Sequence, residues 1–215
     1  MIDLYKIDSV VELRQIIFGS KKQEDRLVER VYDHIDEYAR KFISHSPLVF
    51  FATANDSGHV DVSPKGDAPG FIDIRGDKTL IFPERQGNTD ARNLRHIIEN
   101  DRVSLLFVVP GTKEVLRVTG RATITKNPKL LAKMISCGKP AVLCVEVDVS
   151  ECFFHCGRAF NRSQLWVPEK WPRSEGTYLR DQFSQQRNMN KQEIEEMDEM
   201  AKSLLDELGE TDGAY

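Results

Sequence analysis

Two turns of the chain carry residue types that could bind a phosphate group. The first turn follows the alternating residues 60–63 and places Lys65 at the end of a predicted strand. The second turn follows the apolar run 79–83 and holds Arg85 and Asn88 just before a helical pattern. A helix N-terminus favours anions because its first amides are unpaired and the helix dipole is positive there. The sequence therefore predicts a phosphate-binding site between these turns, formed by Ser63, Lys65, Arg85 and Asn88.

The segments that lead into the first turn have the patterns of β-strands. Val60 and Val62 alternate with Asp61 and Ser63, which predicts a strand with one buried, apolar face. The preceding run, residues 48–54, is almost continuously apolar, as in a strand that is buried on both faces or lies at a subunit contact. Turn-forming residues between the two segments predict a hairpin.

An antiparallel barrel accounts best for the remaining strand patterns. Residues 115–125 alternate most cleanly, with Leu116 and Val118 on one side and Arg117 and Arg121 on the other. About six strands joined by short turns, with helices only at the edges, favour a mainly β, antiparallel barrel over a doubly wound sheet. No G-x-G-x-x-G motif joins a strand to a helix, so a Rossmann site is not indicated. Further strands are predicted at residues 71–75, 79–83, 103–109 and 141–149.

Helical patterns flank the predicted barrel at both ends. Ser9 opens a short helix that Gly19 closes, and a long amphipathic helix is predicted from Ser20 to about His45. A final helix is predicted from Asn190, with an apolar side that packs on the barrel or on a partner subunit. These patterns predict one domain with an N-terminal helical extension (1–46), a barrel (47–167) and a C-terminal helical tail (168–215).

Two shorter helices are predicted inside the barrel region. The helix after Asn88 would place Leu94, Ile97 and Ile98 on its apolar face. Asn127 caps a second, small helix that has proline at its first position.

The composition is that of an ordinary globular protein and excludes several classes of function. The net charge of −4 comes without a basic block, so nucleic acid is not expected as a partner. No run approaches the roughly 18 apolar residues of a membrane helix, and the N-terminus lacks a signal-peptide layout. The histidines have no serine or cysteine nucleophile constellation beside them, which gives no case for a hydrolase. A cytoplasmic enzyme or binding protein for a small molecule fits these observations.

The four cysteines are predicted to be free thiols, because nothing indicates a secretory context. Cys152 and Cys156 flank His155, but the C-x-x-C or paired-histidine spacing of a metal site is missing. Cys152, Phe154 and Cys156 would share one strand face, which favours buried thiols. No metal is predicted.

The order of motifs resembles a known family across residues 47–166. The sequence is similar to the pyridoxamine 5′-phosphate oxidase-like, FMN-binding split-barrel superfamily, and more narrowly to its flavoproteins that are not true vitamin B6 oxidases. The motifs that carry the resemblance are F-F-A-T-A from 50, V-S-P-K-G-D-x-P-G-F from 62, F-P-E-R-Q-G-N from 82, R-V-S-L-L-F-x-x-P-G from 102, L-R-V-T-G-R-A from 116 and H-C-G-R-A-x-x-R-S-Q-L-W from 155.

This resemblance implies a homodimer with FMN held in clefts between the subunits. The strand at 60–65 would run along the flavin, with its backbone meeting the polar edge of the ring. The turn at 87–88 and the start of the next helix would hold the phosphate, and residues 162–166 would close the cleft. With Arg117 added as a candidate cleft residue, the residues expected at the cofactor are Val62, Ser63, Pro64, Lys65, Phe82, Pro83, Glu84, Arg85, Gly87, Asn88, Arg92, Arg117, Arg162, Ser163 and Trp166.

The residue types agree with these roles. A phosphate monoester suits guanidinium forks such as those of Arg85 and Arg92. The isoalloxazine ring needs a flat apolar wall, which Trp166 or Phe82 would supply. The family's relatives often carry basic residues after the Gly-Asn pair, where this chain has Thr89 and Asp90.

The resemblance implies an FMN-dependent oxidoreductase that acts on a small organic substrate. Its reduced flavin would be regenerated through a nicotinamide donor or oxygen, and no catalytic side chain is assigned because the hydride chemistry belongs to the flavin. The C-terminal Arg/His signature of true B6 oxidases is not visible, so a B6 substrate is not expected. Two alternatives stay open: a flavin- or haem-binding module without turnover, and a deazaflavin-dependent reductase of the same fold.

Overall fold

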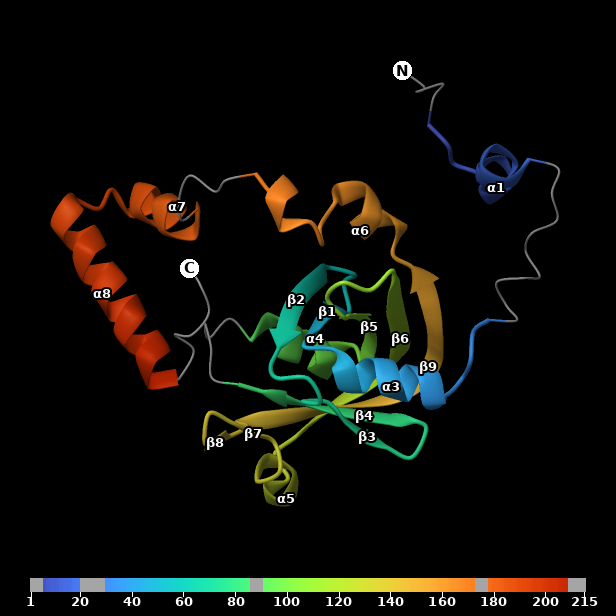
Figure 1. The fold of residues 1–215 in the computed structure, drawn as a ribbon, viewed down its shortest axis with the longest axis horizontal. Helices are drawn as coiled ribbons and strands as arrows, with labels where there is room; N and C mark the ends of the chain where they lie inside the picture. Colours follow the sequence, from blue (N-terminus) through green and yellow to red (C-terminus); the bar gives the residue numbers. More distant parts are fainter. Residues whose placement is uncertain (1–5, 20–29, 86–90, 173–177, 209–215) are drawn as a thin grey trace.

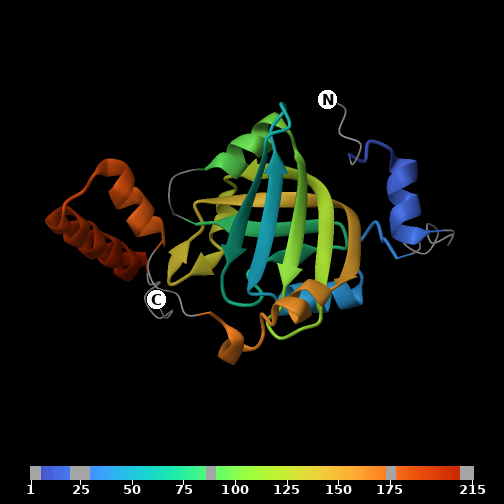
Figure 2. The same ribbon diagram turned by 90° about the horizontal axis from the view of Figure 1, so that it is seen from above.

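A computed structural model describes residues 6–19, 30–85, 91–172 and 178–208 of the chain. Seven strands form one antiparallel sheet in the order β2-β1-β5-β6-β9-β4-β3, and the sheet curls into a barrel (Figures 1 and 2). The predicted mainly β, antiparallel barrel is therefore confirmed. The strands are β1 (Leu48–Ala54), β2 (Val60–Gly66), β3 (Asp73–Arg75), β4 (Thr79–Glu84), β5 (Arg102–Val108), β6 (Glu114–Thr125) and β9 (Leu143–Cys156).

Side-chain alternation along the strands fills the barrel interior with apolar groups. On β6, Leu116 and Val118 are completely buried while Arg117 and Arg121 point outward, as the sequence predicts. Phe51 and Phe82 meet edge to face in the centre, with their ring centroids 5.1 Å apart. Burial of this apolar surface is the main favourable term for folding.

The prediction that Val60 and Val62 form the buried face of β2 is wrong for the single chain. Val60 and Val62 are 64% and 57% exposed, whereas the polar residues between them are partly covered. The reason is that β2 is an edge strand whose polar face turns toward the open side of the barrel, where Lys65 meets Glu84. On β1, only alternate residues are buried, because Phe50 lies on the same outer face as Val62 and is also exposed.

The N-terminal helices differ in part from the prediction. Helix α1 (Val10–Phe18) begins after Ser9, whose side chain accepts a hydrogen bond from the Glu12 amide, and ends at Gly19 as expected. The predicted long helix is wrong over residues 30–36, because Tyr32 instead exchanges backbone hydrogen bonds with Cys152 of β9. Helix α3 (Glu37–His45) begins only where the Asp36 side chain caps the Ala39 amide.

Two short helices and a small hairpin lie in the connections between strands of the barrel. Helix α4 (Arg92–Glu99) packs on β1, but its buried residues are Asn93, His96 and Ile97. The expected apolar face is therefore wrong at Ile98, which is exposed. The reason is that His96 is held inside by a 3.1 Å hydrogen bond between Nδ1 and the Thr53 hydroxyl. Asn127 caps α5 (Pro128–Leu131) as predicted, and β7 (Ile135–Ser136) and β8 (Lys139–Pro140) follow it.

The chain after β9 runs along the barrel and then leaves it. Helix α6 (Arg158–Ser163) and the short 3-10 helix η1 (Pro168–Lys170) lie at one end of the barrel (Figure 1). Helices α7 (Tyr178–Arg187) and α8 (Lys191–Leu208) lie beside the barrel, and Arg180 and Asp198 join them through a 3.0 Å ion pair (Figures 1 and 2). The predicted final helix is confirmed, whereas α7 lacks a clear apolar pattern and is not predicted.

Cys144, Cys152 and Cys156 are free thiols, as predicted. Burial raises the pKa of Cys144, and it raises the pKa of Cys152 to about 12, which favours the protonated thiol at neutral pH. The expected burial of Cys156 is wrong, because this residue lies at the exposed end of β9. Among the described residues, no helix is long and apolar enough to cross a membrane, and no group of potential ligands could hold a metal ion.

Candidate functional site

The ends of β2 and β4, which lead into the two predicted turns, meet across the open side of the barrel. Lys65 at the end of β2 lies 2.7 and 2.9 Å from the two carboxylate oxygens of Glu84 at the end of β4. Because β2 and β4 are not neighbours in the sheet, this largely buried ion pair joins the first strand of the order to the last but one. The structure thus brings the predicted residues Lys65 and Glu84 together.

A second ion pair lies beside the first. The Arg85 guanidinium is 2.8 Å from a carboxylate oxygen of Asp67, and it also donates to the Met134 carbonyl oxygen at 2.6 Å. The Ser136 hydroxyl donates to the other Asp67 oxygen at 2.9 Å. Burial alone would raise the pKa of Asp67, but hydrogen bonds from the Ala68 amide, Ser136 and Arg85 lower it below the ordinary value. Lys65 and Arg85 therefore each have a carboxylate partner, and their contact with a phosphate stays a prediction.

The free edge of β2 is the feature of this region that suits a flat, polar-edged ligand. One side of β2 pairs with β1 from Gly66 to Val60, and no described strand pairs with its other side. Val62 and Pro64 point outward, and Ser63 and Lys65 turn toward the barrel. The strand can therefore offer backbone hydrogen bonds to a ligand.

The ring of Phe82 does not face this edge. Phe82 and Pro83 are both buried, and the Phe82 ring packs against Phe51 in the core. At Phe82 and Pro83 a ligand could therefore reach only the backbone. The expectation that the Phe82 ring forms an apolar surface against a flavin is corrected. Trp166, the other expected wall, is half-buried, packs edge to face on Phe160 and donates from its indole nitrogen to the Thr112 carbonyl oxygen at 3.1 Å.

The start of α4 has features that the sequence analysis did not identify. Ala91, which precedes the helix, has a φ of 47°, a left-handed conformation that is uncommon outside glycine, and it supplies no side-chain cap. In the first turn the Leu94 amide donates to the Asn93 side-chain oxygen at 2.9 Å. Asn93 is only 5% exposed, and its amide nitrogen has no hydrogen-bond acceptor among the described residues. Arg92 lies 3.8 Å from Asp61. A polar residue among the buried positions of a helix is the signal that could have revealed Asn93.

The predicted phosphate turn itself, Gly87 and Asn88, lies outside the described residues. The first turn of α4, for which Ala91 supplies no side-chain cap, directly follows it. Helix N-terminal amides and an unsatisfied buried donor are groups that an anion can satisfy. The residues that follow the predicted turn thus fit a phosphate group.

The remaining predicted residues, Arg117, Arg162 and Ser163, lie on β6 and α6. Arg117 on β6 and Arg162 on α6 line one pocket, together with Arg158, which the sequence analysis did not identify. Ser163 does not line this pocket, and its hydroxyl donates to the Phe160 carbonyl oxygen at 3.0 Å.

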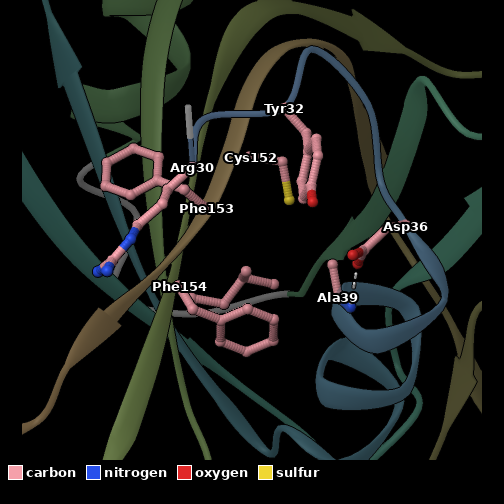
Figure 3. Close-up of a pocket in the computed structure, with 8 residues that line it drawn as sticks. Arg30, Tyr32, Asp36, Ala39, Cys152, Phe153 and Phe154 are labelled. Atoms are coloured by element: carbon pink, nitrogen blue, oxygen red, sulfur yellow. Dashed lines mark hydrogen bonds between the residues drawn. The ribbon is translucent and has the colours of Figure 1, made fainter. Parts of the chain in front are cut away.

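A second cavity lies under the N-terminal segment. It has a volume of about 280 Å³ and lies between residues 30–36, α3 and β9, with the Cys152 sulfur and the Tyr32 ring directed into it (Figure 3). The raised pKa of Cys152 keeps this thiol protonated. The cavity holds no predicted site residue.

Comparison with known proteins gives a family and a set of distant structural relatives. No protein with a curated description matches the sequence. HupZ from Group A Streptococcus is 19% identical, with a TM-score of 0.46 over 56% of this chain and 93% of that one. An FMN-binding protein from Syntrophomonas wolfei is 10% identical, with a TM-score of 0.41 over 61% and 92% of the two chains. The haem storage protein HutZ from Vibrio cholerae is 14% identical, with a TM-score of 0.40 over 57% and 94%.

The family assignment rests on the sequence pattern of the barrel. The pattern of the pyridoxamine 5′-phosphate oxidase family matches residues 35–156, which run from the start of α3 to the end of β9. The match covers more than half of the chain and includes every strand of the barrel. The chain belongs to the pyridoxamine 5′-phosphate oxidase family.

Proposed function

We propose that the protein binds FMN and is an FMN-dependent oxidoreductase that acts on a small organic substrate. The start of α4 carries this proposal, because a helix N-terminus that Ala91 does not cap and the buried, unsatisfied Asn93 amide nitrogen directly follow the predicted phosphate turn. Bound FMN supplies the transfer of hydride or electrons. The chain's own residues bind and orient the cofactor: the β2 edge offers backbone hydrogen bonds to the ring, and the α4 start holds the phosphate.

The first test is the absorption spectrum of the purified full-length protein and the mass of the ligand that it releases. We expect the two visible bands of oxidised flavin and the mass of FMN. A Soret band would instead support the haem-binding alternative, and a deazaflavin mass would support the third. Anaerobic bleaching by NADH or NADPH would distinguish an enzyme from a binding module.

Phosphate recognition makes a sharper prediction for the stripped protein. FMN should bind at least about tenfold more tightly than riboflavin, because the phosphate adds charge-assisted hydrogen bonds. Arg92→Gln should reduce the affinity for FMN and leave the affinity for riboflavin unchanged in a calorimetric titration. Arg75→Gln is the matched control, since Arg75 pairs with Asp73 on β3, away from α4. Equal affinities of the wild-type protein for FMN and riboflavin would contradict the proposed phosphate-binding site.

We further propose that two copies of the chain associate through the outer face of β1 and β2. Val60, Val62 and Phe50 on this face are exposed and apolar, and the face is adjacent to the free edge of β2. Exposed apolar patches of this kind are typical of protein–protein contacts. A partner that covers this face would also enclose a ligand at the β2 edge.

A charge on this face should separate the two copies. We expect Val62→Lys to convert a dimer to a monomer in light scattering and to reduce FMN affinity, because a lysine in the apolar contact would be desolvated. Ile98→Lys is the control, since Ile98 is equally apolar and exposed but lies on α4. A wild-type monomer at micromolar concentration would contradict this proposal.

A further inference from the structure

A pocket of about 380 Å³ lies between the outer face of the sheet and the chain that follows β9. Leu106, Val115 and Arg117 form its floor, and residues 155–162 form its wall. Leu106 and Arg117 are opposite each other in the β5–β6 ladder, so the floor spans two strands. The volume falls within the range of small-molecule sites.

The wall of this pocket is fixed to the sheet at both ends. At one end the Gly157 amide donates to the Lys113 carbonyl oxygen at 2.6 Å, and a Cβ on Gly157 would lie 2.7 Å from that oxygen. At the other end Trp166 donates to the Thr112 carbonyl oxygen. Because both anchors lie in the connection that leads into β6, α6 is held over the strand that carries Arg117. The pocket is therefore part of the folded barrel.

The charges that line this pocket are all positive. Arg117, Arg158 and Arg162 line it, and neither aspartate nor glutamate does. Within the described parts of the chain, none of these three guanidinium groups has a carboxylate partner. Arg121 provides the contrast, since it lies on the same face of β6 and is 2.8 and 2.9 Å from the carboxylate oxygens of Asp101. Uncompensated arginines that converge on one cavity attract anions and suit carboxylate or phosphate oxygens.

The rest of the lining is apolar. Val115 is only 5% exposed although it alternates with the inward-facing Leu116, which shows that the wall covers it. Leu106 and Phe160 add apolar surface beside the arginines. A simple inorganic anion would leave this surface uncovered. The lining therefore suits a molecule with an anionic group attached to an apolar or aromatic body.

We propose that this pocket binds an organic anion, a carboxylate or phosphate ester with an apolar body. This site is separate from the proposed flavin site, because α4 and β2 contribute no residue to it. Loss of anion binding and loss of FMN binding can therefore be observed separately.

The experiment titrates phenyl phosphate and benzoate into the full-length protein, with and without FMN, by calorimetry. We expect both anions to bind and phenol, which has the same ring but no negative charge at neutral pH, not to bind. Arg117→Gln, Arg158→Gln and Arg162→Gln should each weaken anion binding about 10- to 100-fold, as expected for a lost charge-assisted hydrogen bond. The FMN content of these variants should equal that of the wild type.

Arg121→Gln is the matched control, because it removes the same charge from the same strand outside the pocket. The proposal is overturned if phenol binds as tightly as phenyl phosphate, or if Arg121→Gln weakens the anions as much as the pocket variants do. It is also overturned if the pocket variants lose FMN and retain the anions, since the arginines would then belong to the cofactor. Anion binding without any FMN binding would support the pocket and refute the proposed FMN-dependent function.

Discussion

Replacing Gly120 with alanine is expected to destabilise the protein by about 3 kcal/mol or more, close to the upper range for overpacking in a core. Gly120 lies in the middle of β6, where the β6–β9 register shifts between Thr119 and Gly120. A Cβ at this position would lie 2.1 Å from the Asp148 carbonyl oxygen and 3.0 Å from its carbonyl carbon. These are backbone atoms of the neighbouring strand, so no side-chain rotation can relieve the contact.

The measurement is urea unfolding followed by circular dichroism at a fixed protein concentration, because association would make stability depend on concentration. Gly76→Asn is the control. Gly76 has a φ of 57°, which asparagine tolerates, and a Cβ there would have no neighbour within 4 Å. We expect the control to lose less than about 1 kcal/mol. If Gly120→Ala unfolds at the same urea concentration as the wild type, the strands separate at the register shift without cost. The β6–β9 pairing would then need revision.

Features that depend on neighbouring residues could be predicted from the sequence. The caps at Ser9 and Asn127 are local hydrogen bonds, and both occur as predicted. The alternation along β6 is also local, because one strand's buried face needs only the spacing of its own residues. The barrel followed from the number and spacing of such strands.

Features that depend on distant residues could not be predicted. The inverted exposure of Val60 and Val62 follows from the position of β2 at the sheet edge, which the alternation itself does not contain. The loss of helix before Asp36 follows from the pairing of Tyr32 with Cys152, residues that are far apart in the sequence. Periodicity reports that a strand has two different faces, but tertiary contacts decide which face is covered.

The candidate site divides in the same way. The sequence predicted Lys65 and Arg85 as phosphate-binding cations, but their pairing with Glu84 and Asp67 arises only when β2 meets β4. Arg117 and Arg162 were identified for a flavin, and the fold places them in a pocket with the unpredicted Arg158. A charged residue's partner determines whether its charge is available to a ligand. This partner is a property of the fold, so the roles of these residues could be assigned only with the structure.

The second large effect is expected at Phe82, whose ring the structure assigns to the core. Phe82→Ala should destabilise the protein by about 3–5 kcal/mol, because it removes a completely buried ring and leaves a cavity beside Phe51. Phe82→Leu keeps most of the apolar volume and should cost less than about 2 kcal/mol. Urea unfolding at a fixed protein concentration measures both losses.

The leucine variant separates the core role from the role predicted by the sequence. If Phe82 only fills the core, folded Phe82→Leu should bind FMN within about twofold of the wild-type affinity. If the Phe82 ring instead stacks on the flavin, the leucine variant should lose this stacking contact, which is worth about 0.5–1.5 kcal/mol. The affinity for FMN would then fall at little cost in stability. Ile81→Val is the control, because Ile81 is also completely buried on β4 but belongs to the separate cluster under α5. A loss of FMN affinity in Phe82→Leu without a matching loss of stability would return Phe82 to the cofactor site, and the barrel would then have to open at β4 to admit the ring.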